Sequence, residues 1–362
     1  MKTLPLILIA LTGVAVASCS DDEPLEVRQS TESISFRSGM KSRASETTNA
    51  NLKSIYVTAF NGTKPYFENV NFERGADSYF TSASRYDWLE NNETLQFFAY
   101  APSQTELGAD ITNVDGKAGL KLENFSVPDQ IADQVDFITA NASGNKKQNA
   151  ETGVELTFDH RLAQIEIQAK SENKTYTYKV AGVRIGRAEF MGTFDFTTNE
   201  WTLDDWHDTA VYDATCDEIT LTAEPQSIMG PSGNAMLLPQ TLTPWDFKGD
   251  PDNVARDSYL SVLVRILRTD NGYVMYPFDT DTQKDATGQK RQYAWASIPL
   301  SGTWEQGKKY IYTLDFTDGA GVVDPDDPTP GEPVLGSIKF SVNVEQWVDT
   351  PAGIPMTPTY TK

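Results

Sequence analysis

Alternation of apolar and polar residues dominates this chain and predicts β-strands almost throughout. Stretches with apolar side chains at every second position recur between turn-forming residues. No convincing long amphipathic helix interrupts them, although residues 129–136 have room for a short one. The clearest strand predictions cover residues 154–158, 165–167, 190–196, 260–266 and 310–316.

Short turn signals separate these strands. Asn61-Gly62 and Asn271-Gly272 each lie between two strand-like segments. Asn-Gly favours a type I′ hairpin turn, in which both central residues need a positive φ. Many short strands joined in this way are typical of antiparallel β-sandwiches. The chain has 362 residues, which is longer than a single hydrophobic core usually supports, so we expect two such domains.

Two changes in composition divide the chain. Residues 141–153 are poor in apolar side chains and are a candidate interdomain loop. Residues 319–333 are rich in Pro, Gly and Asp, which is typical of an extended linker. One further alternating segment, residues 338–344, follows this linker as a tethered strand. The predicted organisation is a signal segment (1–19), a tether with a displaceable strand (20–43), two β-sandwich domains (44–148 and 149–321), a linker (322–333) and a C-terminal strand segment (334–362).

The N-terminus predicts export. Lys2 precedes an almost unbroken apolar stretch, residues 4–17, which is too short to span a bilayer and is typical of a signal peptide. The stretch ends in Val16-Ala17-Ser18-Cys19, which resembles the lipobox of bacterial lipoproteins, so we expect Cys19 to be acylated. The acidic residues 20–23 resemble the signal that sends lipoproteins of Bacteroidetes to the outer face of the outer membrane. An ordinary solvated tether would have the same composition.

The charge of the chain argues against several partners. The 51 acidic residues outnumber the 30 basic ones, and the net charge of −21 would repel the phosphate backbone of a nucleic acid. It also argues against a polybasic membrane patch, which leaves the lipid as the expected anchor. With Cys19 acylated, Cys216 remains alone, so we expect no intramolecular disulfide.

Few residues could carry catalysis. The two histidines, His160 and His207, lack a second histidine at metal-ligand spacing and a Gly-x-Ser-x-Gly elbow. Cys216 has no basic neighbour in sequence, which indicates an inert thiol. We therefore expect no catalytic residue, no metal, no cofactor and no enzymatic activity. A pair of glycosidase carboxylates hidden among the acidic residues stays open.

Two further groups have a bland and a functional interpretation. The aspartates within residues 324–327 offer oxygen ligands for calcium, but they lack the glycine turn and closing Glu of a calcium loop. We interpret them as solvated linker and leave calcium open. Tryptophans could stack on sugars, yet among strands we expect most to pack in cores. These tryptophans are Trp201, Trp206, Trp245, Trp295 and Trp304.

Several separated segments together resemble the fimbrillin family, the subunits of type V pili of Bacteroidia. The segments that carry the resemblance are the lipobox, residues 34–40 with Ser42-Arg43-Ala44, residues 97–102, 156–167, 304–312 and 338–347. The resemblance implies two transthyretin-like β-sandwich domains and export as a lipoprotein. It also implies assembly by strand exchange after a trypsin-like protease cuts behind an arginine. No catalytic or cofactor residue comes with the family.

The resemblance directs attention to the two terminal strands. We expect the protease to cut between Arg43 and Ala44, in a polar, turn-rich segment, with Arg28 and Arg37 as weaker alternatives. The cut would release a displaceable strand. Its apolar side chains share one parity: Ile34, Phe36 and Met40. The final strand of a neighbour would replace it as donor, through Ile338, Phe340, Val342 and Val344. The alternative is that residues 338–344 are an ordinary edge strand of the second domain.

The expected function is therefore a structural subunit of a surface fimbria that supports adhesion. The expected partners are other copies of the chain or related pilins, anchor and tip subunits, an arginine-specific protease and, through the lipid, the outer membrane. A stalk role is favoured, and a tip or accessory adhesin of the same pilus comes next. A monomeric glycan-binding surface lipoprotein and a surface glycoside hydrolase are the competing functions.

Overall fold

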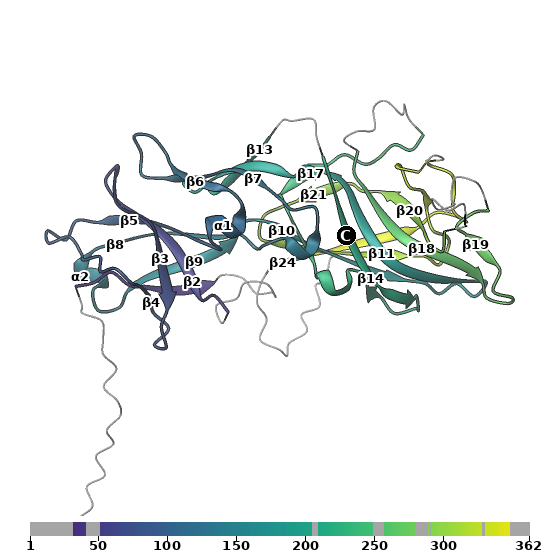
Figure 1. Ribbon diagram of the computed structural model, residues 1–362, viewed down its shortest axis with the longest axis horizontal. Helices are drawn as coiled ribbons and strands as arrows, with labels where there is room; N and C mark the ends of the chain where they lie inside the picture. Colours follow the sequence, from purple (N-terminus) through teal and green to yellow (C-terminus); the bar gives the residue numbers. More distant parts are fainter. Residues whose placement is uncertain are drawn as a thin grey trace, which may run out of the picture.

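The computed structural model describes residues 32–40, 51–204, 209–248, 257–279, 289, 291–327 and 330–347. This part of the chain is built almost entirely from strands, so the prediction of an all-β protein is confirmed. The strands form two bodies that lie end to end along the long axis, the first from the N-terminal half and the second from the C-terminal half (Figure 1). None of the described helices is long and apolar enough to cross a membrane.

The N-terminal body is a sheet that closes on itself. Its strands pair around the ring in the order β1, β4, β3, β2, β5, β8, β9, and β9 returns to β1. All neighbours are antiparallel except β1 and β9, which run parallel. The bounds are β1 Phe36–Met40, β2 Ser54–Asn61, β3 Lys64–Arg74, β4 Phe80–Ser82, β5 Leu95–Ala101, β8 Ile138–Gly144 and β9 Val154–His160.

Apolar residues from each of these strands fill the barrel. The strand β2 buries Ile55, Val57 and Ala59 at alternate positions, as the period-two pattern requires of a strand with one face inward. Aromatic side chains occupy the centre, where Phe67 and Phe97 pack with their ring centroids 6.4 Å apart. This interior is one continuous apolar cluster, separate from the core of the C-terminal body.

The C-terminal body packs two larger sheets over one core. One sheet has the order β15, β10, β22, β24, with β16 also on β10, and the other has the order β14, β11, β18, β20, β23, with β19 also on β18. The bounds in the first sheet are β10 Ala163–Lys170, β15 Gln226–Ser227, β16 Ala235–Leu237, β22 Lys308–Asp315 and β24 Lys339–Gln346. Those in the second are β11 Tyr176–Ala188, β14 Ala210–Thr220, β18 Tyr259–Arg268, β19 Val274–Tyr276, β20 Ala294–Pro299 and β23 Val322–Val323.

A smaller sheet joins the two halves of the sequence. It has the order β13, β12, β7, β6, so strands that follow the barrel strand β5 pair with strands that follow β11. Its bounds are β6 Asp110–Asn113, β7 Leu120–Ser126, β12 Met191–Asp195 and β13 Glu200–Leu203. A two-stranded sheet pairs β17 Gln240–Leu242 with β21 Gly302–Trp304. Short helices complete the structure: α1 Gln104–Leu107, α2 Lys146–Asn149 and the 3₁₀ turns Ile131–Asp133 and Gly230–Ser232.

The interdomain loop expected at residues 141–153 is wrong. These residues contain the end of β8 and the helix α2, and β8 pairs with β5 along its whole length. The next strand, β9, also lies in the barrel, so a boundary at 148/149 cuts through the N-terminal body. The sheets change only after His160. Polar side chains caused the error, because a barrel strand and a short surface helix both expose polar residues to water.

Both Asn-Gly hairpins are present, but neither turn has the predicted form. At the first, Asn61 still pairs with Lys64, and Gly62 rather than Asn61 takes the positive φ, 59°. At the second, Gly272 has a φ of 71° and its N–H donates to the carbonyl of Arg268 at 2.8 Å, so the loop is longer than two residues. Strand pairing across the sheet decided the register, and the turn adapted to it.

Candidate functional site

The strand β1 closes the N-terminal barrel. It pairs with β9 over five residues, from Phe36 opposite Val154 to Met40 opposite Phe158, and meets β4 at one pair, Phe36 with Phe80. No other described strand bridges β4 and β9. Removing β1 would therefore open the barrel along one side and expose two unpaired strand edges.

Apolar side chains just before and within β1 reach the barrel core. Ile34, just before the strand, and Phe36 are fully buried. The Phe36 ring meets Phe72 edge-on at 4.8 Å and Phe97 edge-on at 5.1 Å between centroids. Ser38, the next residue on this face, is half-buried. The backbone of Met40 belongs to the strand, and its side chain lies outside the described residues.

The chain before β1 is tied to the barrel through its main chain. Ile34 N–H donates to the Tyr86 carbonyl at 2.8 Å, and the Ser35 carbonyl accepts from Val154 N–H at 2.9 Å. Trp88 N–H donates to the carbonyl of Glu32 at 2.9 Å. The segment 32–40 is thus held by main-chain contacts on both sides. Arg37 lies within the paired part of β1, where it is opposite Glu155 of β9 in the strand register. A protease needs an extended, unpaired chain, so this pairing protects Arg37.

The remaining expected N-terminal sites, Cys19, Arg43 and Ala44, lie outside the described residues. They stay predictions.

The strand β24 lies at the edge of its sheet. It pairs antiparallel with β22 over eight residues, from Lys308 opposite Gln346 to Asp315 opposite Lys339. In the described part of the chain, its other edge has no strand neighbour. A strand is therefore present where the sequence predicts one, and in this structure it is an edge strand of a sheet in its own C-terminal body (Figure 1).

The apolar side chains of β24 are partly exposed. Phe340, Val342 and Val344 are 40%, 39% and 42% exposed, whereas Ile338, before the strand, is 9% exposed. They point to the same side of the sheet as Leu314, Tyr312 and Tyr310, their partners on β22, which are buried. The described part of the chain exposes only two other large apolar side chains, Tyr66 and Tyr273. These three side chains therefore form one partly exposed apolar row along the edge of the sheet, a feature typical of contact surfaces.

The extended linker predicted before β24 is wrong. Residues 320–327 and 330–336 form a hairpin-like ladder, in which Val323 N–H donates to Glu332 O at 2.8 Å and Ala320 N–H donates to Val334 O at 2.9 Å. One side of it, β23, pairs with β20, and Val323 and Val334 are fully buried. Its neck brings Gly319 against Gly336, where a Cβ on Gly319 would lie 2.3 Å from the Gly336 backbone. The valines on either side of the proline-containing stretch anchor this segment on the second sheet.

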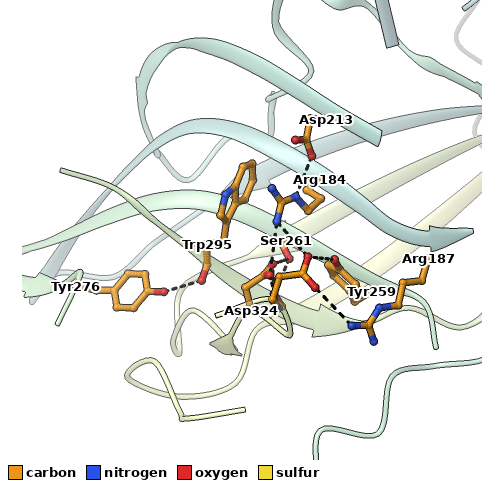
Figure 2. Close-up of polar contacts among 10 residues, drawn as sticks. Arg184, Arg187, Asp213, Tyr259, Ser261, Tyr276, Trp295 and Asp324 are labelled. Atoms are coloured by element: carbon orange, nitrogen blue, oxygen red, sulfur yellow. Dashed lines mark hydrogen bonds and ion pairs between the residues drawn. The ribbon is translucent and has the colours of Figure 1, made fainter. Parts of the chain in front are cut away.

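Asp324 is the polar anchor of the same hairpin. Its carboxylate, 2% exposed, accepts hydrogen bonds from Ser261 on β18 and Ser297 on β20. Figure 2 shows Arg184 approaching it from β11, with 3.6 Å between the guanidinium and the Asp324 carboxylate, while Arg184 also pairs with Asp213. Burial raises the pKa of the Asp324 carboxyl above its usual value.

This network contradicts the solvated-linker interpretation of Asp324 and weakens the calcium alternative. The oxygens of Asp324 are used by two hydroxyls and an arginine, and Asp326 faces Arg184 and Arg187 at 3.6 and 3.5 Å. Among the described residues, no group of three or more acidic, histidine or cysteine side chains could hold a metal ion. A pocket of about 310 Å³ beside it is lined by Arg184, Arg291, Trp295, Asp324, Asp326 and Asp327.

The other candidate groups are structural where they are described. His160 is buried, with Nδ1 2.9 Å from the Asp136 carboxylate. Cys216 is half-buried on β14, and burial raises the pKa of its thiol, which makes the reactive thiolate scarce at neutral pH. Trp245 and Trp304 are buried, and Trp201 and Trp295 are half-buried, so these four do not form an exposed stacking row. Trp206 and His207 lie outside the described residues.

Sequence reasoning assigned no contact to the residue directly after β24. Trp347 is fully buried and stacks on His160, with ring centroids 4.0 Å apart and an interplanar angle of 10°. A large aromatic residue directly after an alternating strand was the available signal. The residue on which it stacks could not be predicted, because His160 lies 187 positions earlier in the sequence.

Comparison with solved structures shows which known fold this chain shares. A fimbrial protein from Bacteroides vulgatus superposes with a TM-score of 0.59 at 15% sequence identity, covering 87% of this chain and 99% of that one. A Bacteroides ovatus protein assigned to cell adhesion gives a TM-score of 0.49 at 16% identity, over 89% of this chain and 100% of that one. The first of these shares the fold, a two-body all-β architecture. No curated protein matches the sequence.

A family model gives the assignment. The fimbrillin-like family matches residues 42–347, and the chain belongs to this family. The predicted resemblance is therefore confirmed. The family is a structural fimbrial and adhesin type rather than an enzyme class, which supports a pilus or adhesin subunit.

Proposed function

We propose that this protein is a polymerising subunit of a surface fimbria, in which β24 of one copy replaces β1 of the next. The observation that carries the proposal is the row of partly exposed apolar side chains on β24. It combines with a barrel that, in the described chain, only β1 closes. An edge strand with an uncovered apolar row is a ready donor for a groove that needs a strand.

The two strands carry the same pattern in the same order. Ile34 and Phe36 are spaced as Ile338 and Phe340 are, so Phe340 would occupy the site of Phe36 between Phe72 and Phe97. The next positions replace Ser38 by Val342 and Met40 by Val344. The donor would therefore bury one apolar side chain more than the strand it replaces, worth about 1.5–3 kcal/mol.

The outward face also tolerates this alignment. In this register Asn343 takes the place of Gly39, where an added Cβ would lie 3.5 Å from the Glu155 carboxylate and 3.9 Å from the Thr157 hydroxyl. Both distances are ordinary van der Waals contacts, so a side chain fits. The new strand would run parallel to β9, as β1 does.

The finer steps of maturation belong to this proposal. The protein is exported through the signal peptide and acylated at Cys19, and an arginine-specific protease then cuts between Arg43 and Ala44. The cut falls three residues after β1 and frees that strand from the rest of the chain. Other copies or related pilins, with anchor and tip subunits, are the assembly partners, and the outer membrane holds the lipid.

Cysteine cross-linking between two copies tests the register. One copy carries Thr157→Cys and is trimmed after Arg43, the other carries Asn343→Cys, and both carry Cys216→Ser. Because Gly39 lies opposite Thr157, the proposal expects an intermolecular disulfide for this combination. Donor copies with Ser341→Cys or Glu345→Cys instead, two residues out of register, serve as matched controls.

Preferential cross-linking of a control would refute the proposed alignment of β24 with β9 but would still support β24 as the donor strand. If none of the three donor copies cross-links while polymers form, β24 is not the donor strand.

A further inference from the structure

Trp347 behaves unlike the strand that it ends. All eight residues of β24 are exposed, yet Trp347 is 0% exposed and is among the largest fully buried side chains of the described chain. Its N–H donates to the Gly307 carbonyl at 2.9 Å. At the other end, Ile338 is 9% exposed. The strand is therefore held by buried residues at its two ends and by main-chain pairing between them.

The site that holds Trp347 is built from both bodies of the molecule. His160, the last residue of the barrel strand β9, supplies the ring on which the indole lies, 4.0 Å away and nearly parallel. Asp136 orients that ring through Nδ1 at 2.9 Å, and both side chains are almost completely buried. Gly307, in the turn before β22, donates its N–H to Leu162 at 2.9 Å and so keeps this turn beside the end of the barrel.

We propose that Trp347 is an autoinhibitory latch that keeps β24 parked on its own sheet until an acceptor groove is available. This inference rests on the proposed function, because it regulates the strand that acts as donor there. Parking gives the β24 main chain a partner and keeps this edge from pairing with the wrong strand before assembly.

The side chains of β24 give a reason for a latch at its end. With Phe340, Val342 and Val344 each about 40% exposed, burial of these side chains is incomplete, and the hydrogen bonds of the strand to β22 lie at a sheet edge. Segments of this kind open locally at low cost. A fully buried indole at the end raises that cost, because an aromatic side chain of this size removes a large apolar area from water.

The position of the latch also connects it to the groove. β9 carries His160 at its end and pairs with β1 through Val154 to Phe158, so the last paired residue is two positions before the stacking ring. The latch partner and the acceptor edge thus belong to one strand. Loss of β1 from β9 loosens the strand that positions His160, and release of the donor becomes easier once the same subunit has been trimmed.

Hydrogen exchange on the untrimmed protein tests the latch without requiring polymerisation. Trp347→Ala should speed exchange of the β24 amides by about 100-fold or more, as expected for truncating a buried tryptophan. Trp347→Phe keeps a ring on His160 and should recover most of the protection. Ser341→Ala, exposed on the other face of the same strand, is the control and should change exchange less than threefold.

The pattern across the molecule separates a latch from a general core role. The proposal requires that β24 alone loses protection in Trp347→Ala, while the barrel strands and β10 keep theirs. Uniformly faster exchange of both bodies, or unchanged exchange of β24, overturns it.

A second measurement, with trimmed acceptor copies, asks whether opening controls joining. Trp347→Ala donors should join acceptors faster than unaltered donors, and equal rates would overturn the regulatory role. If β24 of Trp347→Ala exchanges faster but the protein never joins acceptors, Trp347 restrains β24 as proposed, and the donor function of β24 is refuted.

Discussion

A matched pair of phenylalanine truncations separates the two roles assigned to the terminal strands. Phe36 and Phe340 share a side chain and a strand parity, but Phe36 is 0% and Phe340 is 40% exposed. If β24 replaces β1 during assembly, each truncation should matter in one state of the protein. Phe36→Ala should weaken the untrimmed monomer, and Phe340→Ala should weaken the polymer.

The magnitudes follow from the surroundings of each ring. Phe36 lies between Phe72 and Phe97 at 4.8 and 5.1 Å, so its truncation leaves a cavity in the barrel and should cost about 3–5 kcal/mol. Phe340 is partly in water and contacts one sheet edge, so its truncation should cost the monomer about 1 kcal/mol. In the polymer Phe340 would occupy the Phe36 site, and the cost moves to about 3–5 kcal/mol.

Urea unfolding of the untrimmed monomers measures the first difference. A lower midpoint with an unchanged slope for Phe36→Ala, beside a nearly unchanged midpoint for Phe340→Ala, is the expected result. Polymer yield and resistance to denaturant after trimming measure the second. Phe36→Ala subunits should then behave like the unaltered protein, since the altered residue has been removed.

Two results would refute this reasoning. Equal destabilisation of the two monomers would mean that β24 is an ordinary part of its own core. Normal polymers from Phe340→Ala subunits would mean that another segment fills the opened barrel.

Three further predictions address maturation and the hairpin anchor. Cys19→Ala should release the protein from the membrane fraction, since a multiply acylated terminus supplies the anchor, and retention with unchanged detergent dependence would contradict the lipobox prediction. Arg43→Ala should block trimming and leave β1 in the barrel, and N-terminal sequencing of assembled material should otherwise begin at Ala44; a start at Ser20 would contradict the site. Asp324→Ala should lower the free energy of unfolding by about 1–3 kcal/mol, because the hydroxyls of Ser261 and Ser297 and the Arg184 guanidinium lose a buried acceptor, and an unchanged melting curve would show that water replaces it.

Acidity acts on the Asp324 anchor in a defined direction. Burial raises the pKa of Asp324 in the folded state, so folding favours the protonated carboxyl group. The stabilisation that follows is fully present below the pKa of an unfolded aspartate and is lost as pH rises through the folded pKa. The matching measurement compares the unaltered protein with Asp324→Ala from mildly acidic to neutral pH.

The local pattern of the sequence predicted the strands because alternation is a property of neighbouring residues. Ile34 and Phe36 were expected to share a buried face, and they do. The strand at residues 338–344 was expected from the same pattern, as was the fimbrillin-like family from segments distributed along the chain. In each case the information lies within a few residues, where side-chain direction is dictated by the backbone period.

Tertiary structure decided what contacts what. Residues 141–153 are polar, and residues 319–333 are rich in proline, glycine and aspartate, yet the first segment contains the end of a barrel strand and Asp324 in the second is hydrogen-bonded to serines on β18 and β20. Composition indicates solvent exposure only on average, and a buried carboxylate is stable wherever hydroxyls and a guanidinium converge on it. Likewise, a tryptophan after β24 became a buried contact because His160 and Gly307, remote in sequence, meet at the junction of two sheets. Such meetings depend on the closure of the barrel and the order of the strands, which no short stretch of sequence encodes.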